Sequence, residues 1–291
     1  MSLTLVFIVS GLETGSLYAL MALGLVLIYK TQSIVNFAHG EFLMAGAFIG
    51  FTTYQTLAWP FPVSLVVAVL GSAMLGAAVE RIVVRPLTDH PHATLAMATV
   101  GVSVAIRGAA RLPFGSDIYT FPPIVSGPLV AIGPILISPQ SILTVCVALA
   151  LTAMVFLLLR VTRLGREIKA TQQNSIGAKV VGINIGRIYS VSWALASAIG
   201  GAAGVLAAPL TLLYPDMGAG FLLKGFAAAV LGGFGSVPGA VVGGFLIGVI
   251  EKLVGGFVST SLIDVSSYII IIVVMFIRPQ GLFGRRLSAR V

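Results

Sequence analysis

The stretch that decides the fold is Gly-Phe-Ala-Ala-Ala-Val-Leu-Gly-Gly-Phe (225–234). It opens an uncharged run that reaches Ile250 and is interrupted only at Gly235-Ser236-Val237-Pro238-Gly239. A helix of a soluble core needs one apolar stripe, whereas a run that is apolar on every side for about 20 residues must face lipid or other buried helices. Similar glycine-rich apolar runs recur along the chain, separated by short polar segments. The sequence therefore predicts an all-α integral membrane protein.

The composition supports a single transmembrane domain over 1–291. Hydrophobic residues make up 58% of the chain and charged residues 9%, against about 25% charged in ordinary soluble domains. The net charge of +8 could indicate a nucleic-acid partner. We exclude one because most basic residues lie in 160–187 and 278–290, where they flank apolar spans as in the positive-inside pattern. The one cysteine, Cys146, lies within an apolar run, so neither a disulfide nor a metal site is expected.

The apolar runs predict a polytopic bundle of about eight to nine membrane segments. The expected spans are 5–29, 42–79 (divided in two at Trp59-Pro60-Phe61-Pro62), 93–111, 140–159, 188–209 and 262–277. The chain should be broken or form short helices near 30–41 and 221–256, and we expect two short crossings in the latter. Residues 112–139 contain six prolines and cannot form one regular helix. They are expected to be an external loop.

Charge sets the expected orientation. The basic segment 160–187 is the strongest cytoplasmic marker in the chain. Counting spans back from it places the N-terminus outside and the loop 112–139 outside. The C-terminal arginines, Arg278, Arg285, Arg286 and Arg290, are expected in the cytoplasm.

Few polar residues interrupt the spans, and they are the candidates for a substrate pathway. Glu13, Ser16 and Tyr18 form a polar group in the first span, where a carboxylate is costly and is a functional candidate. The alternative for Glu13 is a structural role, either near the outer headgroups or hydrogen-bonded to a neighbouring helix. The break in the deciding stretch should supply unwound backbone opposite this group, at Gly232, Gly233 and Ser236.

A second polar group follows the first span. Asn36, His39, Gly40 and Glu41 lie close together, but no other histidine or cysteine stands at metal-ligand spacing. We expect a structural turn that breaks the helix, in which Asn36 caps and Gly40 relaxes the backbone.

The cytoplasmic loop 166–184 has small and apolar residues at helical spacing on a polar background. A short surface helix of this kind is expected to lie in a groove of a partner, with Gly177, Ala178 and Gly182 as its contact face. The alternative is a solvated connector.

Five motifs in this order resemble the permease subunits of branched-chain amino acid ABC transporters, of the LivH type. They are Gly-Ser-Leu-Tyr-Ala-Leu-Met-Ala-Leu-Gly-Leu (15–25), Asn-Phe-Ala-His-Gly-Glu-Phe (36–42), Gly-Ile-Asn (182–184), Gly-Phe-Ala-Ala-Ala-Val-Leu-Gly-Gly-Phe-Gly-Ser-Val-Pro-Gly-Ala (225–240) and Arg-Pro-Gln-Gly-Leu-Phe-Gly (278–284). The resemblance implies a multi-pass protein of the bacterial inner membrane. In such permeases the 166–184 loop corresponds to the coupling helix that docks in a cleft of the ATPase.

The resemblance also implies partners and coupling residues. The partners are a second, homologous permease, two cytoplasmic ATP-binding subunits, a periplasmic or extracellular substrate-binding protein and membrane lipid. This chain itself needs no cofactor, because the partner subunits use the ATP. The implied coupling residues are Glu167, Ala170, Gly177, Ala178, Gly182 and Asn184. The family usually has an acidic residue where this chain has Ile176, so the charged contact of the family is not expected there.

Other classes fit less well. The nearest approach to a P-loop, Gly24-Leu-Val-Leu-Ile-Tyr-Lys-Thr31, has Tyr29 where a glycine is needed, so we expect neither ATP hydrolysis nor another enzyme activity here. A stand-alone secondary transporter or channel for small polar solutes remains an alternative, since glycine-rich broken helices occur there too. A permease for urea or short amides is a second alternative.

Overall fold

The computed structural model describes residues 2–132 and 135–284. Its α-helices are α1 (Ser2–Gln32), α2 (His39–Phe51), α3 (Phe61–Val79), α4 (His92–Phe114), α5 (Pro139–Val161), α6 (Arg163–Gln173), α7 (Ser175–Val180), α8 (Ile185–Ala207), α9 (Met217–Gly232), α10 (Val237–Phe257) and α11 (Ile263–Ile277). Short helical turns are η1 (Thr52–Thr56) after α2, η2 (Glu80–Val84) and η3 (Arg85–Leu87) after α3, and η4 (Thr260–Leu262) before α11. Strands β1 (Val130–Ile132) and β2 (Ile135–Ile137) pair as an antiparallel hairpin.

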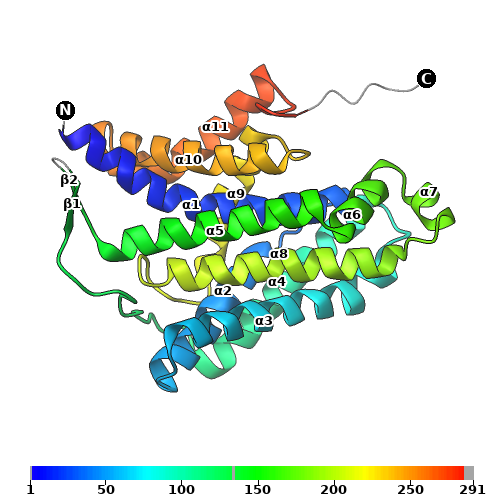
Figure 1. Cartoon of the computed structure of the whole chain (residues 1–291), viewed down its shortest axis with the longest axis horizontal. Helices are drawn as coiled ribbons and strands as arrows, with labels where there is room; N and C mark the ends of the chain where they lie inside the picture. The colour runs from blue at the N-terminus through cyan, green and yellow to red at the C-terminus, as the bar shows by residue number, and fades with distance from the viewer. Residues whose placement is uncertain (1, 133–134, 285–291) are drawn as a thin grey trace.

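The expected all-α membrane bundle is confirmed. Seven helices are long and apolar enough to cross a membrane, and the shorter α2 and α9 complete nine segments in the described part of the chain. Figure 1 shows the long helices side by side, with the N-terminus and the β hairpin at one end and α6 and α7 at the other. We call the end with α6 and α7 the cytoplasmic end and the opposite one the outer end, following the charge pattern of the sequence.

Helix α1 is the centre of the bundle and is buried along most of its length. Glycine allows α10 to approach it closely. A Cβ on Gly248 would overlap the backbone of Gly11 and Gly15, and a Cβ on Gly244 would overlap Ala19. In a membrane, where lipid tails are as apolar as leucine, this close backbone contact supplies much of the packing energy.

Glycine also joins α2 to α8. A Cβ on Gly204 would overlap the carbonyl of Leu43, and a Cβ on Gly46 would overlap the backbone of Gly201. Helices α3, α4, α5 and α11, by contrast, leave most of their apolar surface exposed in the single chain. These helices therefore face lipid or partner subunits.

The break expected near 30–41 lies at Ser33–Ala38, between α1 and α2. After this turn the chain runs back along α1, because a Cβ on Gly24 would overlap the imidazole of His39. Gly24 lies about 12 Å before the end of α1, from the helical rise per residue. Helix α2 therefore begins inside the membrane.

The second break separates α9 from α10 at residues 233–236. Of the two segments, α9 is short with 16 residues, whereas α10 reaches 21 and is long enough to cross a membrane. The amine of Lys30 donates to the carbonyl of Gly235 at 3.2 Å. The α9–α10 turn therefore lies at the cytoplasmic end, beside the end of α1.

The proline-rich segment 112–139 is ordered at the outer end. Helix α4 continues to Phe114, and no helix lies between residues 115 and 138 in the described part of this segment. Tyr119 pairs with Leu213 through two backbone hydrogen bonds and packs against Phe48 and Phe114. The loop thus covers the outer ends of α2 and α4.

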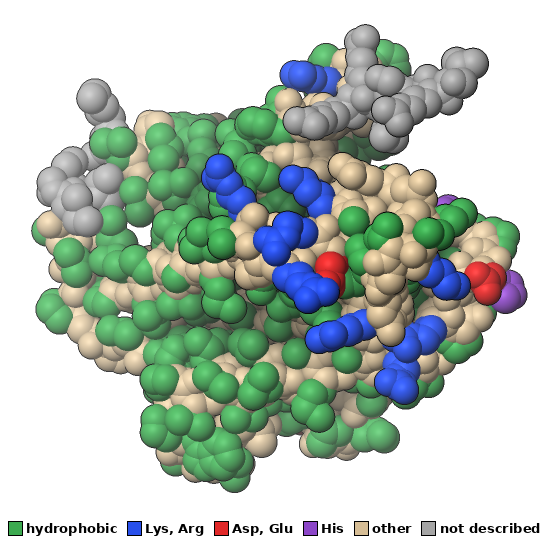
Figure 2. Space-filling model, turned by 45° about the vertical axis from the view of Figure 1, so that its right-hand side comes forward, with side chains coloured by type: hydrophobic (Ala, Val, Ile, Leu, Met, Phe, Trp, Pro, Cys, Tyr) green, Lys and Arg blue, Asp and Glu red, His purple; other side chains and the backbone are tan. Residues whose placement is uncertain are grey.

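The basic residues of 160–187 are exposed together at the cytoplasmic end: Arg160, Arg163, Arg166, Lys169, Lys179 and Arg187. In Figure 2 lysine and arginine side chains gather over this end, while hydrophobic side chains cover much of the remaining visible surface. This separation is what the positive-inside pattern predicts. Arg285, Arg286 and Arg290, which were expected on the same side, lie outside the described residues.

Candidate functional site

The cytoplasmic segment after α5 forms two short helices, α6 and α7, as the helical spacing predicted. Polar side chains cap each helix start. Thr162 accepts from the amide of Gly165 before α6, Asn174 from Gly177 before α7, and Asn184 from Arg187 before α8. Such caps satisfy amides that have no partner within the helix. Asn184, expected to take part in coupling, therefore also ends this segment and begins α8.

The side chains of this segment that a partner can reach differ from those expected. Ala178 was expected on the contact face, but it is only 4% exposed, because α7 turns it toward the rest of the chain. Gly182 is exposed with φ +85° and has open space around it, and Gly177 is half-buried. The accessible apolar side chains are instead Ile176, Val180 and Val181, at 77%, 81% and 75% exposure. We call these three residues the α7 apolar edge.

The other two implied coupling residues lie on α6. Glu167 accepts from the guanidinium of Arg163 at 3.0 Å, one helical turn away. Ala170 is half-buried. Neither side chain belongs to the α7 apolar edge.

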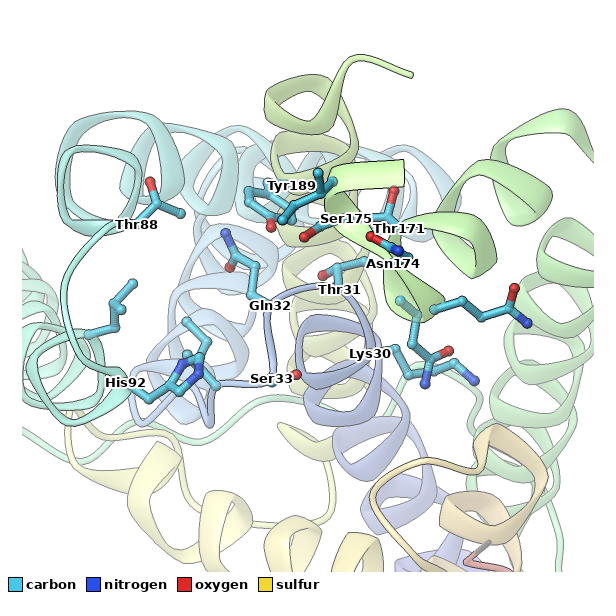
Figure 3. Close-up of a pocket in the computed structure, with 15 residues that line it drawn as sticks. Lys30, Thr31, Gln32, Ser33, Thr88, His92, Thr171, Asn174, Ser175 and Tyr189 are labelled. Atoms are coloured by element: carbon cyan, nitrogen blue, oxygen red, sulfur yellow. The ribbon is translucent and has the colours of Figure 1, made fainter. Parts of the chain in front are cut away.

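A polar cavity of about 410 Å³ lies beneath α6 and α7. Figure 3 shows the end of α1 on one side (Lys30, Thr31, Ser33), Thr88 and His92 on another, and the α6–α7 junction and Tyr189 above. The cavity therefore separates the cytoplasmic helices from the membrane-spanning helices.

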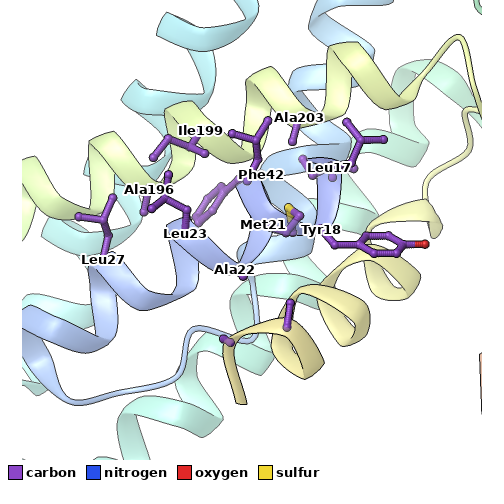
Figure 4. Close-up of a cluster of buried hydrophobic side chains, with 14 of the residues drawn as sticks. Leu17, Tyr18, Met21, Ala22, Leu23, Leu27, Phe42, Ala196, Ile199 and Ala203 are labelled. Atoms are coloured by element: carbon purple, nitrogen blue, oxygen red, sulfur yellow. The ribbon is translucent and has the colours of Figure 1, made fainter. Parts of the chain in front are cut away.

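The three polar residues of the first span do not face one open space. Ser16 is buried and donates to the carbonyl of Glu13 at 2.7 Å, which satisfies its hydroxyl within α1. Glu13 is half-buried, and its Oε1 has no partner among the described residues. Tyr18 packs edge-on against Phe221 of α9, and in Figure 4 its ring points away from the cluster around Met21 and Phe42.

The residues expected opposite Glu13 lie at the other end of the bundle. Gly232 packs against the backbone of Gly239, Gly233 ends α9 with φ +101°, and Ser236 caps α10 by accepting from the amide of Gly239. The turn that they form lies beside Lys30, about 25 Å along α1 from Glu13. The expected pairing of the two groups is therefore wrong, because α9 runs toward the cytoplasm and carries its end away from the outer half.

The turn before α2 has the structural features that the sequence indicated. The side chain of Asn36 accepts from the amide of Ala38 at 2.9 Å. A Cβ on Gly40 would overlap the carbonyl of Gly218, the second residue of α9. Hence the N-termini of α2 and α9 meet inside the membrane. His39 is fully buried between α1 and α8, and neither ring nitrogen has a partner among the described residues.

Glu41 does more than complete this turn. Its Oε1 accepts from the hydroxyl of Ser103 at 2.9 Å and from the guanidinium of Arg107 at 3.0 Å. Arg107 also binds Asp216 at 3.2 Å, and Arg111 binds the second oxygen of Asp216 at 2.7 Å. We call these five residues the outer charge cluster. It links α4 to the starting points of α2 and α9.

The cluster lies within the membrane-spanning part of the molecule. Arg107 is about 10 Å from the outer end of α4 and about 22 Å from its cytoplasmic end, from the helical rise. Glu41 is 2% exposed, but Arg107, Asp216 and Arg111 are 28%, 45% and 46% exposed. Charges at this depth do not face lipid, because lipid cannot solvate them. The exposed side of the cluster therefore faces water or a partner subunit.

Four members of this cluster are not among the site residues expected from the sequence. Arg107 and Arg111 fall at the end of the expected span 93–111, and neither Ser103 nor Asp216 is among the candidate residues. One signal was available: Thr99, Ser103, Arg107 and Arg111 recur every four residues, which places them on one face of a helix. In the structure Thr99 accepts from the amide of Phe37, in the turn before α2.

A second group of charges joins α9, α10 and α11. The amine of Lys224 binds Glu251 at 2.7 Å and Asp264 at 3.0 Å. It also lies 5.5 Å from the centre of the Tyr18 ring. Lys224 and Glu251 are 17% and 5% exposed, so this pair is covered by the surrounding helices.

Comparison with known proteins gives a consistent result. A family model described as "Branched-chain amino acid transport system / permease component" matches residues 7–277. The high-affinity branched-chain amino acid transport system permease protein LivH of Salmonella typhimurium is 29% identical over 290 residues, which cover 95% of this chain and 94% of the relative. The corresponding protein BraD of Pseudomonas aeruginosa is 32% identical over 294 residues, covering 96% and 95%.

More distant similarities were also found. The ribose import permease protein RbsC of Escherichia coli is 32% identical over 114 residues, only 37% of this chain and 34% of the relative. The solved structure of PsaBC from Streptococcus pneumoniae in complex with Fab aligns with 93% of this chain and 91% of that chain. Its TM-score is 0.49 at 12% identity.

Proposed function

Since the chain belongs to the family of branched-chain amino acid transport permeases, we propose that it is the membrane permease subunit of an ATP-driven importer for branched-chain or related amino acids. The match over residues 7–277 carries this proposal, because it includes nearly every membrane segment and the cytoplasmic helices. The transport function named for the relatives supports the substrate class.

The proposed assembly contains a second permease, two cytoplasmic ATP-binding subunits and an extracytoplasmic binding protein that delivers the amino acid. The chain is placed with its N-terminus outside and its C-terminus in the cytoplasm. The exposed basic residues around α6 and α7 support this orientation. ATP hydrolysis belongs to the partner subunits, and this subunit forms part of the pathway.

The α7 apolar edge is the proposed docking surface for an ATPase. Three neighbouring aliphatic side chains that are at least 75% exposed are unfavourable in water unless a partner covers them. A short helix with an apolar edge fits into a hydrophobic groove. Ala178 is excluded from this surface by its burial, whereas Gly182 is exposed and lets the chain turn sharply after α7.

Two alternative functions differ from this proposal in their partners or in their solute. A stand-alone secondary transporter or channel would work without ATPases and would have no use for the α7 apolar edge. A urea or short-amide permease would use the same assembly but a different solute. ATPase binding tests the first alternative, and competition for uptake between leucine and urea tests the second.

The docking test uses a double variant, Val180→Asp with Val181→Asp, in the full chain co-expressed with the partner subunits. We expect the ATPases to be lost from the purified complex and uptake to fall with them, because two buried carboxylates oppose docking. The control is Val258→Asp. Val258 is 68% exposed at the outer end of α10, so this variant should leave the complex intact. Full ATPase recovery with the double variant would contradict the docking proposal.

A further inference from the structure

We propose that the outer charge cluster binds the two charged ends of a zwitterionic amino acid during transport. In this proposal Glu41 receives the ammonium group, and Arg107 with Arg111 receives the carboxylate. The proposal rests on the proposed transport function and adds a recognition site to it. It is carried by the geometry of three helices, by the unused hydrogen-bonding atoms of the cluster and by its partial exposure at membrane depth.

The cluster has hydrogen-bonding capacity to spare. Glu41 is almost fully buried, yet its Oε2 has no partner among the described residues, and the same is true of the Nε of Arg107. An unpaired carboxylate oxygen is costly inside a membrane, so a buried one is a candidate for binding a ligand. Oε2 is itself enclosed in this structure, so an ammonium group from a bound solute would satisfy it in a conformation that uncovers it.

The other half of the cluster suits a carboxylate. A guanidinium group presents several donors in a fork that matches the two oxygens of a carboxylate. Asp216 occupies such donors of Arg107 and Arg111 in this conformation, and all three side chains are more than a quarter exposed. An incoming carboxylate can therefore replace Asp216 without opening the helix core.

The backbone adds to this preference. Helices α2 and α9 both begin at the cluster, and Gly40 and Gly218 bring their N-termini into contact. The N-terminus of a helix carries a partial positive charge and free amide groups, both of which favour a nearby anion. Broken helices that meet within a membrane serve as binding sites for solute carboxylates in other transporter classes.

Gly220, one turn into α9 from Asp216, has open space beside it, because a Cβ there would meet no atom within 4 Å. The Lys224–Glu251 pair lacks this openness. Its carboxylate Oε2 also has no partner among the described residues, but its cation is a lysine that is only 17% exposed and that also pairs with Asp264 in the first turn of α11.

The test measures binding of radiolabelled L-leucine to the purified complex of permeases and ATPases, with the binding protein left out. Two competitors separate the charged groups: 3-methylbutylamine lacks the carboxylate, and 4-methylpentanoate lacks the ammonium group. In the wild-type complex we expect each competitor to need a concentration at least about tenfold higher than unlabelled leucine to displace the label, because each leaves one charged partner unpaired.

The variants should change this selectivity in opposite ways. In Glu41→Gln, 4-methylpentanoate should compete as well as leucine, whereas 3-methylbutylamine should remain weak. In Arg107→Gln, the amine should compete as well as leucine and the acid should remain weak. A merely structural role cannot produce this crossed pattern. Glu80→Gln is the control for losing a buried acid, since Glu80 pairs with Arg85 at 2.9 Å at the cytoplasmic end; its selectivity should equal that of wild type.

The outcomes separate the two proposals. If wild-type complex transports leucine but the two variants keep wild-type selectivity, the zwitterion site is wrong and the transport function stands. The same conclusion follows if the variants lose all leucine binding while Glu80→Gln loses it equally. If the wild-type complex with its binding protein transports no amino acid, the proposed function itself fails.

Discussion

The Lys224–Glu251 pair and the outer charge cluster both hold a buried glutamate within membrane-spanning helices, but they differ in how far the cation is covered. Lys224 is 17% exposed and is enclosed by α1, α10 and α11. Arg111 is 46% exposed and Arg107 28%. The covered pair fixes neighbouring helices to one another, whereas the open cluster keeps cations available at the meeting point of two helix N-termini. Charges in a membrane helix therefore need not share one role.

The largest expected effect is on the covered pair. Lys224→Met leaves Glu251 buried without its cation, which should lower the free energy of unfolding by about 3–5 kcal/mol. Thermal unfolding of the purified complex measures this loss of stability. Lys252→Met is the control, because Lys252 neighbours Glu251 on α10 and has no ion pair with a described residue. If the pair only holds helices together, Lys224→Met combined with Glu251→Leu should recover most of the stability. Failure of that recovery would indicate a functional role for this pair too.

The second largest effect is the loss of stability when a glycine on a packed helix face, rather than on an open one, is replaced by leucine. Gly204→Leu places a side chain against the carbonyl of Leu43 and should cost about 1–3 kcal/mol or more through overpacking between α2 and α8. Gly108→Leu adds the same side chain to the open face of α4 and should leave the stability of the single permease unchanged. The yield of folded permease in detergent compares the two. Equal losses would show that the face of α4 is not open in the folded protein.

The smallest expected effect lies within the outer charge cluster. Ser103→Ala removes the hydroxyl that donates to Glu41 and accepts from Arg107, but it leaves the direct Arg107–Glu41 ion pair in place. We expect a loss of about 1 kcal/mol in stability and a raised KM for leucine uptake. Ser64→Ala is the matched control, because Ser64 is equally buried and its hydroxyl has no partner among the described residues. A loss as large for Ser64→Ala would mean that the Ser103 hydrogen bond contributes nothing specific.

Local patterns were enough to predict the membrane spans, the two breaks and the helical cytoplasmic segment. Hydropathy, glycine and proline act within a few residues, so they can be read without knowing the fold. Four-residue spacing marks Gly11 and Gly15 as positions of close helix packing without naming their partner, which in the structure is Gly248 of α10.

Contacts between distant segments could not be predicted in this way. Arg107 and Asp216 are far apart in sequence, and they meet only because α9 begins deep in the bundle beside Gly40. The same starting depth moves Gly232 and Ser236 to the cytoplasmic end, away from Glu13. Ala178 was misplaced because helical spacing defines the faces of α7 without showing which face packs inward.

The central claim, that this chain works in an ATP-driven importer, is tested most directly by leucine accumulation in proteoliposomes. The complete complex is reconstituted with ATP enclosed on the side of the ATPases and with leucine-loaded binding protein on the other side. We predict accumulation of labelled leucine above its external concentration only when ATP can be hydrolysed, and none with a non-hydrolysable analogue. Accumulation driven by an ion gradient without ATP, or simple equilibration in the presence of ATP, would contradict the account.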